Sequence, residues 1–82
     1  MVTEWTVAVD AADLIGEGPA WEGARQSLLW TDIAGRRIHR LDPATGATWI
    51  RSLPQMAGAV LPRAGGGLAL CLQDGVYLAD AD

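Results

Sequence analysis

The sequence places a single carboxylate, Glu17, between Gly16 and Gly18 in a glycine-rich turn that ends at Pro19. Carboxylate oxygens are ligands that hard cations such as Ca²⁺ and Mg²⁺ prefer, and a metal held there can polarise a carbonyl group or activate a water molecule. A glutamate in a tight turn can also serve the backbone alone, by accepting N–H groups of the turn. The residues leave both roles open, with Glu17 as the candidate metal ligand.

The other residues that could do chemistry favour structural roles. His39 has no cysteine or second histidine nearby to complete a zinc set, which predicts a surface or edge histidine. Asp32 follows Trp30-Thr31, and we expect it to hold a turn or a hydrogen bond inside a sheet. Ser27 lacks the Gly-x-Ser-x-Gly setting of a serine nucleophile. No residue is therefore predicted to be catalytic.

The elements that must position Glu17 read as short strands. Residues 4–9 alternate between apolar and polar types, the two-residue period of a half-buried strand. Further strand-like runs follow, separated by turns rich in glycine, proline and aspartate. They cover residues 19–22, 28–33, 37–41, 47–53, 58–63, 68–72 and 76–79. The chain is therefore predicted to be all-β.

The strand pattern repeats along the chain, as the 39 positions that separate Trp21 from Val60 illustrate. A period of about 40 residues with four short strands is typical of a β-propeller blade. We predict a leading strand over 4–9, one blade over about 19–53 and an incomplete second blade over about 58–80. About two blades of a propeller are then present. A plain meander of hairpins is the alternative.

Three residue types add detail to this prediction. The four tryptophans accompany no basic patch, which predicts packing between blades rather than stacking on nucleic-acid bases. The single cysteine, Cys71, lies in an apolar run and is predicted to be a buried thiol. Arg36, Arg37 and Arg40 are predicted to form a solvated hairpin.

Composition narrows the classes of partner. Half of the 82 residues are hydrophobic, which argues against a disordered chain. The net charge of −4 argues against a nucleic-acid partner. No apolar run reaches the roughly 18 residues that a membrane span needs, and the acidic start of the sequence carries no secretory signal. The prediction is a soluble cytoplasmic protein with no nucleic-acid or membrane partner.

Taken together, several motifs resemble the SMP-30/gluconolactonase/regucalcin-like family. The resemblance runs through residues 14–80. The motifs are Leu14-Ile15-Gly16-Glu17-Gly18-Pro19-Ala20-Trp21, Leu28-Leu29-Trp30-Thr31-Asp32-Ile33, Ile38-His39-Arg40-Leu41-Asp42-Pro43, Gly58-Ala59-Val60 and Gly66-Gly67-Leu68.

The resemblance implies a six-bladed propeller with a divalent cation (Ca²⁺, Zn²⁺, Mn²⁺ or Mg²⁺) in the funnel of the ring and Glu17 as one ligand. It implies hydrolysis of small sugar-acid lactones. The family's other metal ligands, an Asn and an Asp, and its substrate-binding Arg and Asn have no counterpart in this sequence, so the substrate-binding residues stay unknown. The chain is expected to be the N-terminal part of a metal-dependent sugar lactonase, inactive alone.

Two further possibilities stay open. The chain could instead be a non-catalytic propeller-blade module that binds calcium or assembles with partner chains. In addition, the incomplete second blade leaves an open edge, which is a template for pairing with another strand. The leading strand, 4–9, has the right length to fill that edge in a second copy. Strand-exchanged self-association is therefore a further prediction.

Overall fold

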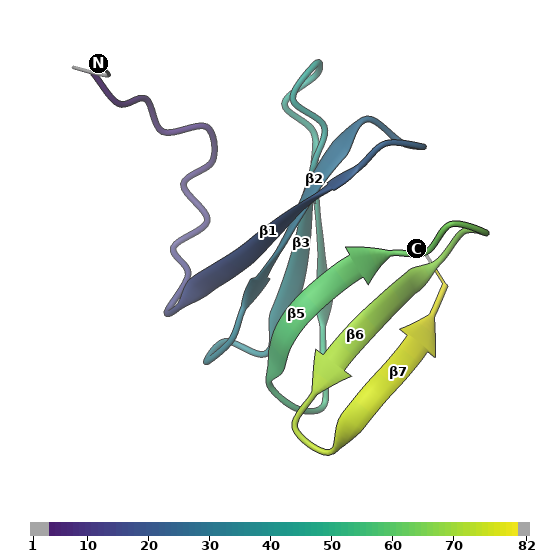
Figure 1. Cartoon of the computed structure of the whole chain (residues 1–82). Helices are drawn as coiled ribbons and strands as arrows, with labels where there is room; N and C mark the ends of the chain where they lie inside the picture. The colour runs from purple at the N-terminus through teal and green to yellow at the C-terminus, as the bar shows by residue number, and fades with distance from the viewer. Residues whose placement is uncertain (1–3, 81–82) are drawn as a thin grey trace.

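The computed structural model describes residues 4–80, which form seven strands (Figure 1). Within this range there is no helix of the length and apolarity that would cross a membrane. The ends of the predicted domain 1–82 lie outside the described residues. The strands are β1 (Gly16–Glu22), β2 (Ser27–Asp32), β3 (Arg37–Leu41), β4 (Thr48–Ser52), β5 (Ala57–Pro62), β6 (Leu68–Leu72) and β7 (Gly75–Ala79).

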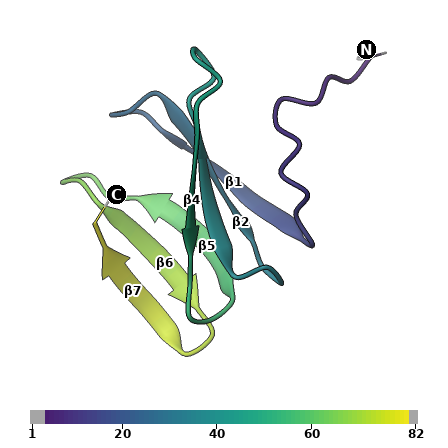
Figure 2. The same cartoon turned by 180° about the vertical axis from the view of Figure 1, so that it is seen from behind.

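The strands form two antiparallel sheets in which each strand pairs with its neighbour in the sequence. The first sheet has the order β1-β2-β3-β4 and the second the order β5-β6-β7. β5 lies against β1 and β2 of the first sheet, and the two views in Figures 1 and 2 show the second sheet beside the first. The predicted all-β architecture is confirmed.

Apolar side chains from both sheets meet in one core. Leu29 of β2 and Ile38 of β3 are fully buried, as are Val60 of β5 and Leu68 of β6. Trp49 of β4 packs against this cluster and is partly buried. Because removal of apolar surface from water is the main force that joins such elements, this core fixes the two sheets against each other.

The strand predicted over residues 4–9 is not formed. Residues 4–15 pair with no strand and run beside the first sheet as an irregular segment, purple in Figure 1. Trp5 is 89 % exposed and Val7 76 % exposed. A strand is held by hydrogen bonds to a neighbouring strand, and among the described residues no strand pairs with this segment. The alternation of apolar and polar residues is therefore insufficient by itself to form a strand.

β7 is the outer strand of the second sheet, and within residues 4–80 no strand pairs with its free edge. Val76 and Leu78 on this strand are exposed. The second sheet thus has three strands where the first has four. The exchange of a strand between copies at this edge stays a prediction.

Candidate functional site

Glu17 lies inside β1 rather than in a turn ahead of it. It pairs with Thr31 of β2, and the register shifts between Glu17 and Ala20. The glycine-rich run is thus a β-bulge, and Gly18 within it has a φ of +60°, a backbone conformation that residues other than glycine rarely adopt. The predicted turn was wrong because the bulge inserts an extra residue without ending the ladder.

The bulge also brings the two sheets together. A Cβ atom placed on Gly18 would lie 3.6 Å from the carbonyl oxygen of Gly58, in β5. The innermost strands of the two sheets therefore approach each other closely beside Glu17, and β5 forms one boundary of the site.

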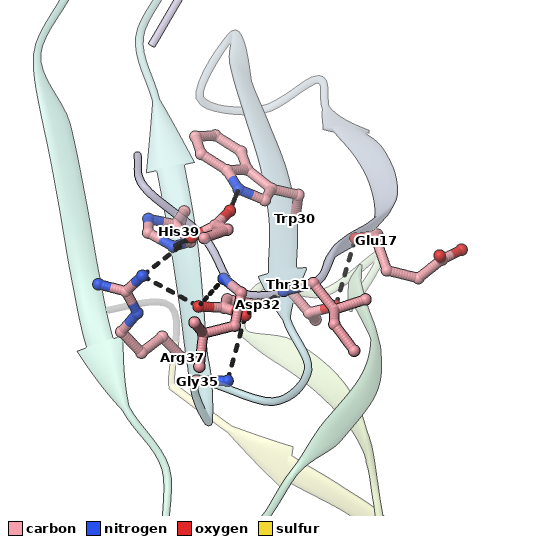
Figure 3. A network of polar contacts seen from close by, with 10 residues as sticks. Glu17, Trp30, Thr31, Asp32, Gly35, Arg37 and His39 are labelled. Carbon is pink, nitrogen blue, oxygen red and sulfur yellow. Dashed lines mark hydrogen bonds and ion pairs between the residues drawn. The ribbon is translucent and has the colours of Figure 1, made fainter. Parts of the chain in front are cut away.

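The Glu17 side chain is exposed, and within residues 4–80 its carboxylate has no hydrogen bond or ion pair. Figure 3 shows it pointing away from the polar residues behind it. Only its backbone is used: its carbonyl accepts a hydrogen bond from Thr31 Oγ1 at 3.2 Å. The structure therefore does not support the alternative role, in which the Glu17 carboxylate accepts backbone N–H groups of its own turn.

Behind Glu17 lies the fully buried carboxylate of Asp32, at the end of β2 (Figure 3). It accepts the N–H groups of Leu14 at 3.2 Å and Ile15 at 2.9 Å. It also accepts the Gly35 N–H at 3.1 Å and pairs with the Arg37 guanidinium at 3.0 Å. The Ile15 N–H above all, and then Arg37, hold the pKa of Asp32 well below its usual range against the opposite effect of burial. The structural role predicted for Asp32 is confirmed.

A second carboxylate, Asp13, extends this network. It lies 3.0 Å from the Arg37 guanidinium, 2.8 Å from Trp30 Nε1, which donates to it, and 2.8 Å from His39 Nε2. Asp13 does not stand out in the sequence because its partners lie 17 to 26 positions further along the chain. No local pattern marks such a residue.

Two predictions about β3 were wrong. His39 is 2 % exposed rather than on the surface. Arg37 is half-buried and paired with Asp13 and Asp32, and Arg40 is buried. Arg40 Nε donates to Glu22 Oε1 at 3.0 Å in a buried pair, and its guanidinium lies 4.8 Å from the Trp49 ring centroid. The reason is that side chains stand on the faces of a sheet and those of β3 meet partners there. His39 contacts Asp13 and the Trp30 ring, and Arg40 contacts Glu22 and the Trp49 ring. Only Arg36, in the turn, is exposed as predicted.

The tryptophans and the cysteine also differ in part from expectation. Trp49 packs against the core between the sheets, as predicted, but Trp5 and Trp21 are exposed and Trp30 stacks on His39. Cys71 is half-buried rather than buried, because it lies on the three-stranded sheet, whose outer strand β7 is largely exposed.

The fit of a divalent cation depends on Glu17. A solvent-exposed carboxylate with no protein partner is a suitable oxygen ligand for a hard cation. Within residues 4–80, however, no group of three His, Cys, Asp or Glu side chains is placed to hold a metal. The described residues therefore offer Glu17 as one possible ligand, and a cation bound there would need its other ligands from outside residues 4–80.

A family model described as the SMP-30/Gluconolactonase/LRE-like region matches residues 15–82. The chain belongs to this family. Glu17, its bulge and the Asp32 network all lie in or directly beside the matched range, whereas most of the unpaired segment 4–15 precedes it.

The relatives of this SMP-30/gluconolactonase-like chain include sugar lactonases. It is 41% identical to the 6-deoxy-6-sulfogluconolactonase of Pseudomonas putida over 68 residues, which are 83% of this chain and 23% of the relative. It is 48% identical to pentonolactonase XacC of Haloferax volcanii over 42 residues, 51% of this chain and 14% of the relative. The chain thus spans about a quarter or less of the length of these relatives.

A solved structure supports the fold of this SMP-30/gluconolactonase-like chain. Regucalcin from Agrobacterium tumefaciens, described as a calcium-binding protein, superposes with a TM-score of 0.84 at 30% identity. The match covers 90% of this chain and 25% of that protein. Regucalcin is a β-propeller, so the two sheets are two propeller blades, as predicted, the second with three strands.

Proposed function

We propose that the chain is the N-terminal part of a metal-dependent sugar-acid lactonase and that Glu17 is one ligand of its divalent cation. Membership of a family that includes a gluconolactonase and a pentonolactonase supports the substrate class. The calcium-binding description of regucalcin supports a divalent metal.

The observation that carries the proposal is the contrast between the backbone of Glu17 and its side chain. Its backbone is held by the ladder to β2 and by the Thr31 hydroxyl, while its carboxylate is exposed and has no partner among residues 4–80. A charged group that stabilises a fold is normally paired, as Asp32 and Glu22 are here. An ordered backbone that presents an unused carboxylate is what a metal ligand requires.

The chemistry expected of such a site is simple. A bound cation would polarise the lactone carbonyl and activate a water molecule for attack on it. Within residues 4–80 no group of three potential ligands is present, so the ligands other than Glu17 and the groups that orient the substrate would come from other parts of the complete protein. Because positioning supplies much of the catalysis, we expect the 82-residue chain alone to be inactive.

The test compares Glu17→Gln with Glu4→Gln in the complete protein that contains this chain. Both changes remove one exposed glutamate charge and keep the side-chain shape, but Glu4 lies in the unpaired segment. Hydrolysis of gluconolactone and of a pentonolactone is followed with and without chelator, corrected for spontaneous hydrolysis. We expect chelator-sensitive turnover that Glu17→Gln lowers at least tenfold and Glu4→Gln leaves unchanged. Equal activity of both variants would contradict the proposal.

A second candidate function follows from the regucalcin match. The chain would then belong to a propeller that binds calcium without turning over a lactone, or that assembles with partner chains. Calcium binding that Glu17→Gln weakens, in a complete protein with no lactone hydrolysis, would favour this candidate. The two candidates share the ligand and differ in the reaction.

A further inference from the structure

The backbone in front of Glu17 has no strand to hold it. Residues 4–15 pair with no strand, yet Leu14 and Ile15 must deliver the chain to β1 at a fixed place and angle. Two kinds of contact do this. The Ile15 carbonyl accepts the Ile33 N–H at 2.9 Å, and the Asp32 carboxylate accepts the N–H groups of both Leu14 and Ile15.

Asp32 is itself held rigidly on its other side. Its Oδ1 accepts the Gly35 N–H at 3.1 Å, and its Oδ2 lies 3.0 Å from the Arg37 guanidinium. A Cβ atom on Gly35 would lie 2.0 Å from Asp32 Oδ2, so the carboxylate occupies the space that a side chain would take there. The Asp32 carboxylate therefore joins the 14–15 segment to the turn between β2 and β3.

The residue before Asp32 in β2, Thr31, holds the chain on the other side of Gly16, at Glu17. Thr31 is fully buried, and its hydroxyl donates to the Glu17 carbonyl at 3.2 Å. Glu17 is thus fixed by Asp32 through the residues before it and by Thr31 directly, immediately before the bulge at Gly18. None of these contacts uses the Glu17 carboxylate.

We propose that Asp32 is a positioning residue for the Glu17 carboxylate: through the Leu14 and Ile15 N–H groups it sets the direction in which that carboxylate is presented to the cation. Thr31 assists through the Glu17 carbonyl. Asp32 is fully buried and its carboxylate contacts Leu14, Ile15, Gly35 and Arg37 rather than the exposed Glu17 side chain, so its effect on the cation is indirect. This inference rests on the proposed role of Glu17 as a ligand.

The test measures Mn²⁺ affinity of the complete protein that contains this chain, by calorimetry and, for weak variants, by the paramagnetic resonance signal of the free ion. Asp32→Asn keeps the shape but removes the anionic acceptor of the Leu14, Ile15 and Gly35 N–H groups. Groups that orient a metal ligand typically change metal affinity 10- to 100-fold. We therefore expect at least a tenfold loss for Asp32→Asn and a several-fold loss for Thr31→Val.

Glu22→Gln is the matched control. Glu22 is also buried and paired with an arginine, but it lies at the opposite end of β1. The substitution Glu22→Gln should lower the melting temperature without changing Mn²⁺ affinity. Equal losses of affinity for Asp32→Asn and Glu22→Gln would mean that general destabilisation weakens binding, which would overturn the inference.

A double variant separates this inference from the proposed function. If Asp32 acts through Glu17, Asp32→Asn adds no further loss of Mn²⁺ affinity once Glu17→Gln is present, whereas independent effects would add. Wild-type affinity of Glu17→Gln would contradict the proposed ligand. Wild-type affinity of Asp32→Asn, with a weakened Glu17→Gln, would overturn the positioning role alone. If Asp32→Asn does not fold, Thr31→Val decides, and wild-type affinity in that variant overturns the inference.

Discussion

The rings of Trp30 and His39 are stacked, with centroids 4.7 Å apart and planes 6° from parallel. Trp30 Nε1 and His39 Nε2 each lie 2.8 Å from an oxygen of the same carboxylate, that of Asp13. One acidic side chain from the unpaired segment thus satisfies two aromatic residues of the first sheet and ties that segment to it.

Replacement of Asp13 by alanine should destabilise the protein. It leaves Trp30 Nε1 and His39 Nε2 without their acceptor, and a buried polar group left unsatisfied costs about 1–3 kcal/mol. Chemical unfolding followed by tryptophan fluorescence measures the change. Asp10→Ala is the control because Asp10 is exposed in the same segment, and it should have almost no effect. Equal destabilisation by the two variants would show that the shared carboxylate is unimportant.

Stability should fall in acid because of Asp32. Its pKa is lowered in the folded protein, whereas in the unfolded chain it is about 3.9. Its contribution is therefore complete above about pH 4 and is lost as the pH falls towards the folded value. The free energy of unfolding, measured between pH 7 and pH 3, should decrease below about pH 4 in the wild type and less steeply in Asp32→Asn. Parallel curves would contradict this assignment.

Gly18→Ala should cost about 1–2 kcal/mol, the penalty of a left-handed backbone for a residue with a Cβ atom. Gly18 has a φ of +60°, and a Cβ atom there would make only an ordinary contact, at 3.6 Å, with the Gly58 carbonyl, so the cost comes from the backbone. Gly23→Ala is the control, since a Cβ atom there meets nothing within 4 Å and its φ is not positive. Thermal unfolding compares the two. Similar melting temperatures would mean that the bulge relaxes without cost.

Breaking the buried pair of Glu22 and Arg40 should be severe. Arg40→Met leaves the Glu22 carboxylate buried without its partner, and such losses cost about 3–5 kcal/mol. The double change Glu22→Leu with Arg40→Leu should recover part of this loss because no buried charge remains. Arg36→Met, at an exposed arginine of the same hairpin, should change stability by less than about 0.5 kcal/mol. A harmless Arg40→Met would refute the pairing.

The sequence was sufficient for most of the strands. Hairpin turns such as Asp42-Pro43 and Asp74-Gly75 and the apolar runs between them are local patterns, and the strands from β2 to β7 lie close to the predicted ranges. Residues 4–9 carry the same kind of pattern but form no strand. A strand needs a neighbouring strand to pair with, and the local sequence pattern does not show whether such a neighbour is present.

Of the residues in the candidate site, only the exposed Glu17 was predicted as a functional residue from the sequence. Glu17 stands out because glycines surround it, although the bulge that holds it was mistaken for a turn. Asp13, His39 and Arg37 could not be assembled from the sequence, because their contacts join two segments 24 to 26 positions apart. The charges of Arg37 and Arg40 suggested solvent, and only the fold brings them to their acidic partners Asp13, Asp32 and Glu22.

The pairing of each strand with its neighbour in the sequence has a consequence for how the protein folds. No hairpin of the first sheet must wait for a distant segment, and loop closures this short are fast. During synthesis, the first blade can therefore form once its last strand, β4, has left the ribosome. The polar network behind Glu17, whose members lie within residues 13–39, could then form before β5 has emerged, so that the proposed ligand is in place when later parts of the chain arrive.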